Sequence, residues 1–242
     1  MHWRQMALAI ALTTLALPAQ AATLQFAGYS WDVRDYGGLP GPNSWDGDNV
    51  FVDAAGLHLR IVKSGDTWNA SEVVMTAPLG FGTYRFEIAG RPDRLDRNVV
   101  LGLFNFPASD AVVPAGTNEI DVEVSQWGDA GDPNRLNWTV QPSVPGLKST
   151  HKGLPLRLKS DRSTYRFTWS ATGVTYDWFP GYPDAAARPA ATWIDAPAEP
   201  AKHIPQSPLV VHMNLWLIGG KPPHDGKPVE IVITSFSFTP AP

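Results

Sequence analysis

The sequence contains no cysteine among its 242 residues. Disulfides and thiolate-bound metals are therefore excluded, together with any redox function based on cysteine. The stability of the protein must come from a buried core, which a chain of this length that is 43% hydrophobic can supply. The chain also lacks any block of Lys or Arg, and its formal net charge is -4. We therefore expect neither a nucleic acid nor an anionic membrane surface as a partner.

Long hydrophobic runs are absent too, except for one at the N-terminus. Arg4 provides a positive start, Met6–Leu17 is apolar apart from two threonines, and Pro18 ends the run. Small residues up to Ala21 then form the pattern of a cleavage site. We predict that residues 1–21 are a signal peptide cleaved after Ala21, and that the mature protein is secreted or periplasmic. No later segment is long and apolar enough to span a bilayer.

Apolar residues do not recur with a helical period outside that first segment. Instead, 23 prolines and 21 glycines divide the chain into short segments in which apolar and polar residues alternate. This pattern predicts an all-β sandwich or barrel, and we expect residues 22–242 to form one domain. We interpret Asp184–Pro208, which is rich in Pro and Ala, as a long surface loop. The predicted strands are Leu57–Val62, Gly82–Ile88, Val99–Phe106, Glu119–Val124, Leu136–Gln141, Thr164–Ser170, Val174–Phe179, Leu209–Leu217 and Val229–Phe238.

One of these strands carries three carboxylates on the same face. Glu119, Asp121 and Glu123 alternate with apolar residues, and alternate residues of a strand point to the same side. Neighbouring acids on that face lie roughly 6.5–7 Å apart, so their repulsion costs free energy and raises at least one pKa. From this strand alone, an acidic surface and a functional site are equally good interpretations.

A second strand favours the functional site. Within Leu209–Leu217, His212, Asn214 and Trp216 share one face, and apolar residues form the other. Trp127 continues the parity of the three acids further along the chain. Indole rings offer an apolar face on which a sugar ring can stack. We therefore predict that Trp127, Trp216, Asn214 and His212 bind a sugar, although His212 is equally well interpreted as a structural residue.

Glycoside hydrolysis is a reaction that needs a pair of carboxyl groups. In the retaining mechanism one attacks the anomeric carbon and the other protonates the leaving oxygen, with the two about 5–5.5 Å apart. The Cα atoms of Glu119 and Glu123 would lie about 13 Å apart on a flat strand, so the sheet must be curved with the acids on its concave side. Asp121 can share a proton with one glutamate, and its charge helps to keep the acid protonated.

The segment Glu119–Glu123 resembles the E-[IL]-D-x-E signature of glycoside hydrolase family 16, the laminarinase and lichenase group. Gly82–Glu87 is similar to the G-x-Y-x-x-E strand of that family, and Met213–Trp216 is similar to its M-N-L-W strand. The resemblance implies a concanavalin-like jelly roll, a β-sandwich of two curved antiparallel sheets with a concave substrate cleft. It also implies retaining endo-hydrolysis of a β-linked polysaccharide.

By position, the resemblance implies that Glu119 is the nucleophile, Asp121 its helper and Glu123 the acid/base. No cofactor is expected to be required, although some relatives carry a structural Ca²⁺ whose ligands the sequence does not locate. Asp46–Asn49 and Gly128–Asn134 look like calcium loops. Turn chemistry explains both better, because the EF-hand spacing and its final Glu are missing.

Further candidates for substrate binding lie outside these two strands. The resemblance points to Asn137 as a cleft residue, and cross-strand hydrogen bonding explains it equally well. Exposed glutamates are common in strands, so Glu72 and Glu87 are weaker candidates. By parity we assign Trp138 and Trp169 to the core. The further substrate-binding residues that we predict are Asn137, Trp45, Glu87 and Arg135.

Other functions use the same residues. A carbohydrate-binding or cell-wall protein would bind the glycan without turnover, and a transglycosylase would use a sugar acceptor in place of water. Three mutually repelling acids favour an enzyme, because a binding protein has little reason to keep them. We expect a monomeric glycosidase with a β-glucan as the favoured substrate; laminarin, mixed-linkage glucan and galactans are all compatible. A serine hydrolase is not expected, since the sequence has no G-x-S-x-G elbow.

Overall fold

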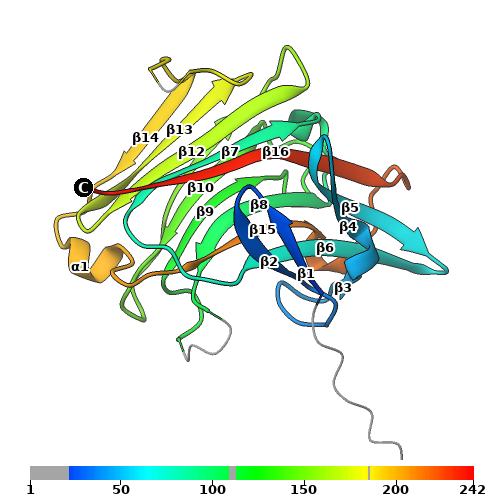
Figure 1. Cartoon of the computed structure of the whole chain (residues 1–242), viewed down its shortest axis with the longest axis horizontal. Helices are drawn as coiled ribbons and strands as arrows, with labels where there is room; N and C mark the ends of the chain where they lie inside the picture. The colour runs from blue at the N-terminus through cyan, green and yellow to red at the C-terminus, as the bar shows by residue number, and fades with distance from the viewer. Residues whose placement is uncertain (1–21, 109–112, 185) are drawn as a thin grey trace, which may run out of the picture.

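The structure is a computed structural model that describes residues 22–108, 113–184 and 186–242. Strands dominate the described residues, which confirms the predicted all-β class. They form two layers of almost entirely antiparallel strands, as expected for a jelly-roll sandwich (Figure 1). The signal peptide predicted for residues 1–21 lies outside the described residues.

The layer that carries the three acids is called the front sheet here. In spatial order its strands are β11 (Thr150–Pro155), β10 (Asn134–Gln141), β9 (Glu119–Val124), β8 (Val99–Phe106), β15 (Val210–Leu217) and β6 (Thr67–Met75). Three short strands extend it beyond β6: β2 (Tyr29–Val33), β1 (Thr23–Phe26) and the parallel β3 (Ser44–Trp45). The acid-bearing β9 therefore lies inside the sheet, with β10 and β8 on its two sides.

The other layer is called the back sheet. In order, it contains β4 (Val50–Asp53), β5 (Gly56–Ser64), β16 (Val229–Pro240), β7 (Gly82–Ala89), β12 (Arg162–Ser170), β13 (Gly173–Pro180) and β14 (Ala191–Asp195). The end of β5 pairs with the start of β6, and this hairpin joins the two sheets. In Figure 1, β14, β13, β12 and β7 fan out at the top, and β8, β15 and β6 curve below them.

Apolar side chains from both sheets meet between the layers. Ile120 and Val122 of β9 are fully buried in the same core cluster as Phe167 of β12. Trp138 and Trp169 belong to this cluster too, which confirms their assignment to the core. Because the apolar face of β9 fills the core, its acidic face lies on the outside of the sandwich.

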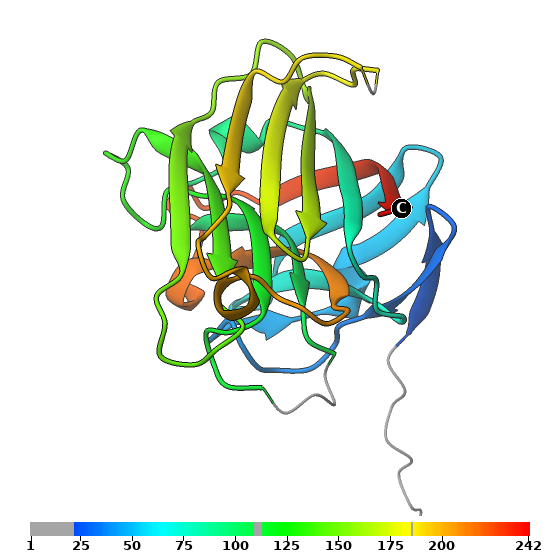
Figure 2. The same cartoon turned by 90° about the vertical axis from the view of Figure 1, so that its left-hand side faces the viewer.

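The predicted strands all correspond to strands of the structure, with small differences at their ends. The interpretation of Asp184–Pro208 as a loop is wrong in part, because Ala191–Asp195 pairs with β13 as strand β14 and Pro200–His203 forms the short helix α1. Figure 2 faces this side of the molecule, with β14 in gold and α1 below it. Single helical turns lie at η1 (Gly47–Asn49), η2 (Pro92–Arg94) and η3 (Ile218–Gly220).

Candidate active site

The register of the front sheet fixes which residues of β10 and β8 lie beside the three acids. Glu123 lies opposite Asn137 of β10 and opposite Gly102 of β8, while Asp121 lies opposite Phe104 of β8. This register places the acids between β10 and the polar row of β15, since β8 pairs with β9 on one side and β15 on the other.

All three acids project from the outer face of the front sheet, as their alternation predicted. Glu119 and Glu123 keep part of their surface exposed, whereas Asp121 between them is only 5% exposed. The two glutamates are therefore accessible from solvent, and the shorter aspartate lies deeper between them.

Burial raises the pKa of each acid, and neighbouring groups then shift the three pKa values by different amounts. Burial and the charge of Glu119 raise the pKa of Glu123 to about 8. The pKa of Asp121 is raised well above its ordinary value by burial and by the charges of both glutamates. Burial raises the pKa of Glu119 as well, but a hydrogen bond with Asp121 and the nearby His212 act in the opposite direction. The pKa of Glu123 therefore favours its protonated form at neutral pH. The hydrogen bond between Asp121 and Glu119 raises the pKa of Asp121 and lowers that of Glu119, so Asp121 is the donor of this pair.

The polar row of β15 lies on the same outer face. His212 is the register partner of Phe104, and Asn214 is the register partner of Gly102. The Oδ1 atom of Asn214 occupies the place that a Cβ on residue 102 would need, so only glycine lets this amide lie across β8 beside Glu123. Asn214 is 1% exposed and its Oδ1 has no hydrogen-bond partner in the described part of the chain.

An aromatic cluster lies at the end of this row. Trp216 and Trp127 meet edge to face with ring centroids 6.3 Å apart, and Trp45 packs in the same cluster as Trp216. Trp127 is 37% exposed, whereas Trp216 and Trp45 are buried. Trp127 lies beyond the end of β9 and has a positive φ of 53°. A turn therefore sets its position, and the strand parity used for the prediction does not apply to it.

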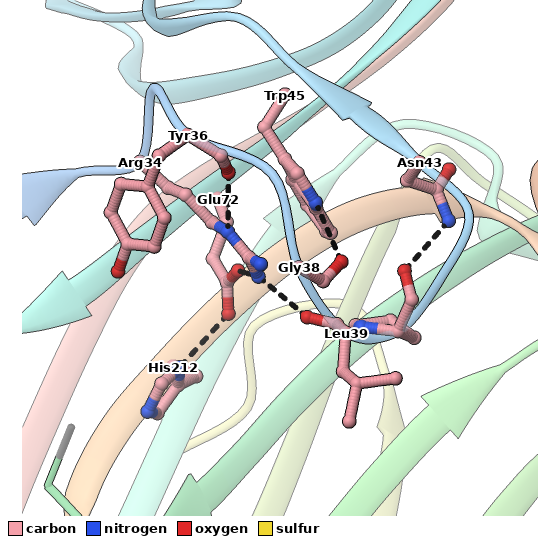
Figure 3. A network of polar contacts seen from close by, with 9 residues as sticks. Arg34, Tyr36, Gly38, Leu39, Asn43, Trp45, Glu72 and His212 are labelled. Carbon is pink, nitrogen blue, oxygen red and sulfur yellow. Dashed lines mark hydrogen bonds and ion pairs between the residues drawn. The ribbon is translucent and has the colours of Figure 1, made fainter.

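A buried polar network lies next to this cluster (Figure 3). Arg34, which follows β2, donates to Glu72 of β6, and the other oxygen of Glu72 lies 2.9 Å from Nδ1 of His212. The Arg34 guanidinium also lies over the Trp45 ring, 4.1 Å from its centroid. Arg34 was not predicted; its only sequence signal is that it continues the outward parity of Asp32 in a short strand.

Asn137 also lies on the outer face beside Glu123, as predicted. It is 2% exposed, and its Oδ1 lies 3.2 Å from Nε2 of His151 on β11. Its Nδ2 donates to the carbonyls of Ser125 and Arg135 over 3.4 and 3.3 Å. These hydrogen bonds fix the Asn137 amide in its position beside Glu123. His151 was not predicted, because it lies on the edge strand β11, which the alternation of apolar and polar residues did not indicate.

Two predicted residues do not lie with the acids. Glu87 is on β7 of the back sheet and accepts hydrogen bonds from Arg85. Arg135 lies within an irregularity of the β10–β11 register, between Asn134 and Leu136, and its guanidinium donates to the carbonyl of Leu95. We therefore remove Glu87 and Arg135 from the substrate-binding set. The alternation of residues in a strand indicates on which face a side chain lies, but it indicates neither the sheet to which the strand belongs nor the position of a bulge.

The two loops that look like calcium loops use their acids in turns. Asp46 accepts from the backbone N–H of Asp48, and Asp129 and Asp132 accept from backbone N–H groups two residues further on. Within the described residues, no group of three or more His, Asp or Glu side chains is arranged to hold a metal ion. A Ca²⁺ site is therefore not located. Among the same residues, no helix is long and apolar enough to cross a membrane.

At the level of sequence, neither a family model nor a curated protein matches this chain. Solved structures do match its fold. The β-glucanase of Bacillus licheniformis superposes with a TM-score of 0.65 at 18% identity, covering 93% of this chain and 100% of that one. A glycoside hydrolase family 16 endo-glucanase from Bacteroides ovatus gives 0.65 at 15% identity, over 86% and 94% of the two chains.

A third similar structure is a Mycobacterium tuberculosis protein described as an immunostimulatory antigen and pseudo β-1,3-glucanase. It gives a TM-score of 0.61 at 20% identity, over 84% of this chain and 88% of that one. At these identities the similarity shows the fold. The chain therefore has the jelly-roll fold of the family 16 β-glucanases.

Proposed function

We propose that this protein is a retaining endo-glycosidase that hydrolyses a β-linked glucan. The observation that carries the proposal is the trio on β9: two accessible glutamates flank a buried aspartate that shares a hydrogen bond with Glu119. The β-glucanases with the same fold support the choice of substrate class.

The residues divide the reaction into two steps. Glu119 attacks the anomeric carbon and forms a covalent ester as the glycosidic C–O bond breaks, and Glu123 gives its proton to the departing oxygen. Glu123, now a carboxylate, takes a proton from water, whose oxygen attacks the same carbon and releases Glu119. Loss of the Glu119 charge in the ester also lowers the pKa of Glu123, because that charge is one of the two causes of its rise. The acid of the first step thereby becomes the base of the second.

The direct test replaces each glutamate separately, as Glu119→Gln and Glu123→Gln. We expect loss of reducing-sugar release from laminarin and mixed-linkage glucan by roughly 10⁴-fold or more, in keeping with loss of an acid/base or nucleophile. Glu87→Gln is the matched control, because Glu87 is also an outward strand glutamate but lies on the back sheet. Activity that survives either site substitution would end this mechanism, and an inverted product anomer seen by NMR would replace retention with inversion.

A non-catalytic glycan-binding protein is the second candidate, and it is favoured by the neighbour described as a pseudo-glucanase. The Trp127 and Trp216 pair would serve either function. A binding titration on the same glycans distinguishes them: binding by the wild type without any release of reducing sugar would favour the binding protein. Products longer than the substrate would instead indicate transglycosylation.

We also propose that the protein acts outside the cytoplasm, because its first residues have the pattern of a secretory signal. N-terminal sequencing of the protein recovered from the periplasm or the culture medium should begin at Ala22. Recovery of the uncleaved chain in the cytoplasm would contradict this.

A further inference from the structure

The Arg34–Glu72–His212 network holds one imidazole rigidly beside the acids. Glu72 is 2% exposed, and its two oxygens are used by different partners, one by Arg34 and one by Nδ1 of His212. Burial alone would raise the pKa of Glu72, but His212 and Arg34 outweigh it and lower this pKa. Glu72 is therefore a carboxylate that accepts the Nδ1–H of His212, which fixes both the ring and its tautomer.

Aromatic contacts orient the same ring over β8. His212 stacks on Phe104 with centroids 4.8 Å apart and an interplanar angle of 23°. Its edge meets Phe106 at 5.9 Å and 88°. Phe104 is the register partner of His212 on one side and of Asp121 on the other. The imidazole therefore lies between β15 and the acid strand, near enough to Glu119 to lower the pKa of that residue.

The other ring nitrogen of His212, Nε2, differs from Nδ1 in its surroundings. Nε2 of His212 is buried without a hydrogen-bond partner among the described residues. A buried polar atom left unpaired costs about 1–3 kcal/mol, and the contacts of the ring with Glu72, Phe104 and Phe106 prevent Nε2 from turning away. Nε2 of His212 is thus fixed in position near Glu119, where a ligand atom could supply the missing hydrogen bond.

Resting on the proposed function, we propose that His212 is a specificity-determining residue whose Nε2 binds one unsubstituted hydroxyl of the sugar ring that Glu119 attacks. With Nδ1–H donated to Glu72, Nε2 is the ring nitrogen left for a ligand, and a sugar hydroxyl, which can both donate and accept a hydrogen bond, is a matching partner. Glu72 and Arg34 are positioning residues that act through His212. A ring that lacks this hydroxyl cannot make the contact with Nε2 and is bound less well.

The test uses a variant that keeps the network while it removes Nε2. In His212→Asn the side-chain amide can take the place of Nδ1 and still donate to Glu72, whereas no atom replaces Nε2. We expect kcat/KM on a laminari-oligosaccharide to fall about 10-fold, the value of one lost hydrogen bond. A series of the same oligosaccharide, each member lacking one hydroxyl of the reacting ring, should contain one member on which wild type and His212→Asn are equal.

Two further variants test the positioning residues. Glu72→Ala frees the imidazole and should give the same 10-fold loss, while Glu72→Gln keeps an acceptor for Nδ1–H and should restore much of it. His203→Ala is the control, because His203 lies on α1, which contacts the loop after β10. It should leave kcat/KM unchanged. Thermal unfolding of each variant confirms that the fold is retained.

The outcomes separate this proposal from the proposed function. If wild type cleaves the oligosaccharide and His212→Asn loses the same factor on every deoxy analogue, Nε2 binds no hydroxyl and the proposal is overturned. If wild type cleaves no glycan, the proposed function fails. The role of Nε2 is then tested by calorimetry, which compares the binding of the same oligosaccharides to wild type and to His212→Asn. Weaker binding of the parent sugar by His212→Asn, with equal binding of one deoxy analogue, supports it; equal binding throughout overturns it.

Discussion

Replacing Glu123 by Gln should stabilise the folded protein at alkaline pH while it removes activity. Burial and the charge of Glu119 raise the pKa of Glu123 from 4.5 to about 8. A carboxyl group whose pKa rises on folding holds its proton more tightly in the folded than in the unfolded state. The wild-type free energy of unfolding therefore decreases as the pH rises from 4.5 to about 8, and the loss is complete above that range.

The size of this effect follows from the same values. One pKa unit corresponds to about 1.36 kcal/mol, so a rise from 4.5 to about 8 corresponds to about 5 kcal/mol as an upper limit. Glu123 keeps part of its surface exposed, and solvent screens its charge there. We therefore expect Glu123→Gln, which has the shape of the protonated acid without the charge, to gain about 2–3 kcal/mol at about pH 9.

Urea unfolding at about pH 5 and about pH 9 measures the difference. At the lower pH the wild-type carboxyl is protonated, so the two proteins should have nearly equal free energies of unfolding. At the higher pH the variant should be more stable. Glu87→Gln is the control, since it removes a negative charge that pairs with Arg85 on the back sheet and should give no alkaline gain. A gain of the same size at both pH values would refute the reasoning, because charge would then not be its cause.

Three other changes follow from individual contacts. Gly102→Ala should cost about 1–3 kcal/mol in urea unfolding and lower the proposed hydrolysis of β-glucan, because the new Cβ collides with Oδ1 of Asn214; an active variant of unchanged stability would contradict this. Trp127→Ala should raise KM up to about 10-fold with little change in melting temperature, since this ring is 37% exposed and meets Trp216 edge to face; an unchanged KM would exclude it from substrate binding. Burial lowers the pKa of His58, but Glu230 and Asp53 outweigh it and raise it above 6.5. Its ion pairs therefore add stability that is complete below pH 6.5 and is lost as pH rises through the folded pKa. His58→Gln should thus destabilise the protein more at acidic than at alkaline pH, and an equal loss at both would show that the charge of His58 does not matter.

Strand alternation accounts for much that the sequence predicts correctly. Because the side-chain period of a strand is two residues, the apolar set Ile120 and Val122 had to face the core, and the acids between them had to face away. The same rule placed His212, Asn214 and Trp216 on one outer face. Short edge strands such as β11 and β14 were missed, because half-exposed strands with mixed residues carry little periodicity. The interior strand β6 was missed as well, because its buried residues include the polar Asn69, Ser71 and Glu72 and hide the alternation.

The sequence by itself determined the class of fold, the face on which each strand residue lies and the shared outer face of the three acids, because these depend only on local periodicity and residue type. Only the tertiary structure decided which strands are neighbours. It placed β8 between β9 and β15, brought Arg34 and Glu72 to His212 and moved Glu87 to the opposite sheet. Pairing between strands far apart in the chain depends on how whole faces pack into a shared core, and the alternation within one strand carries no information about it.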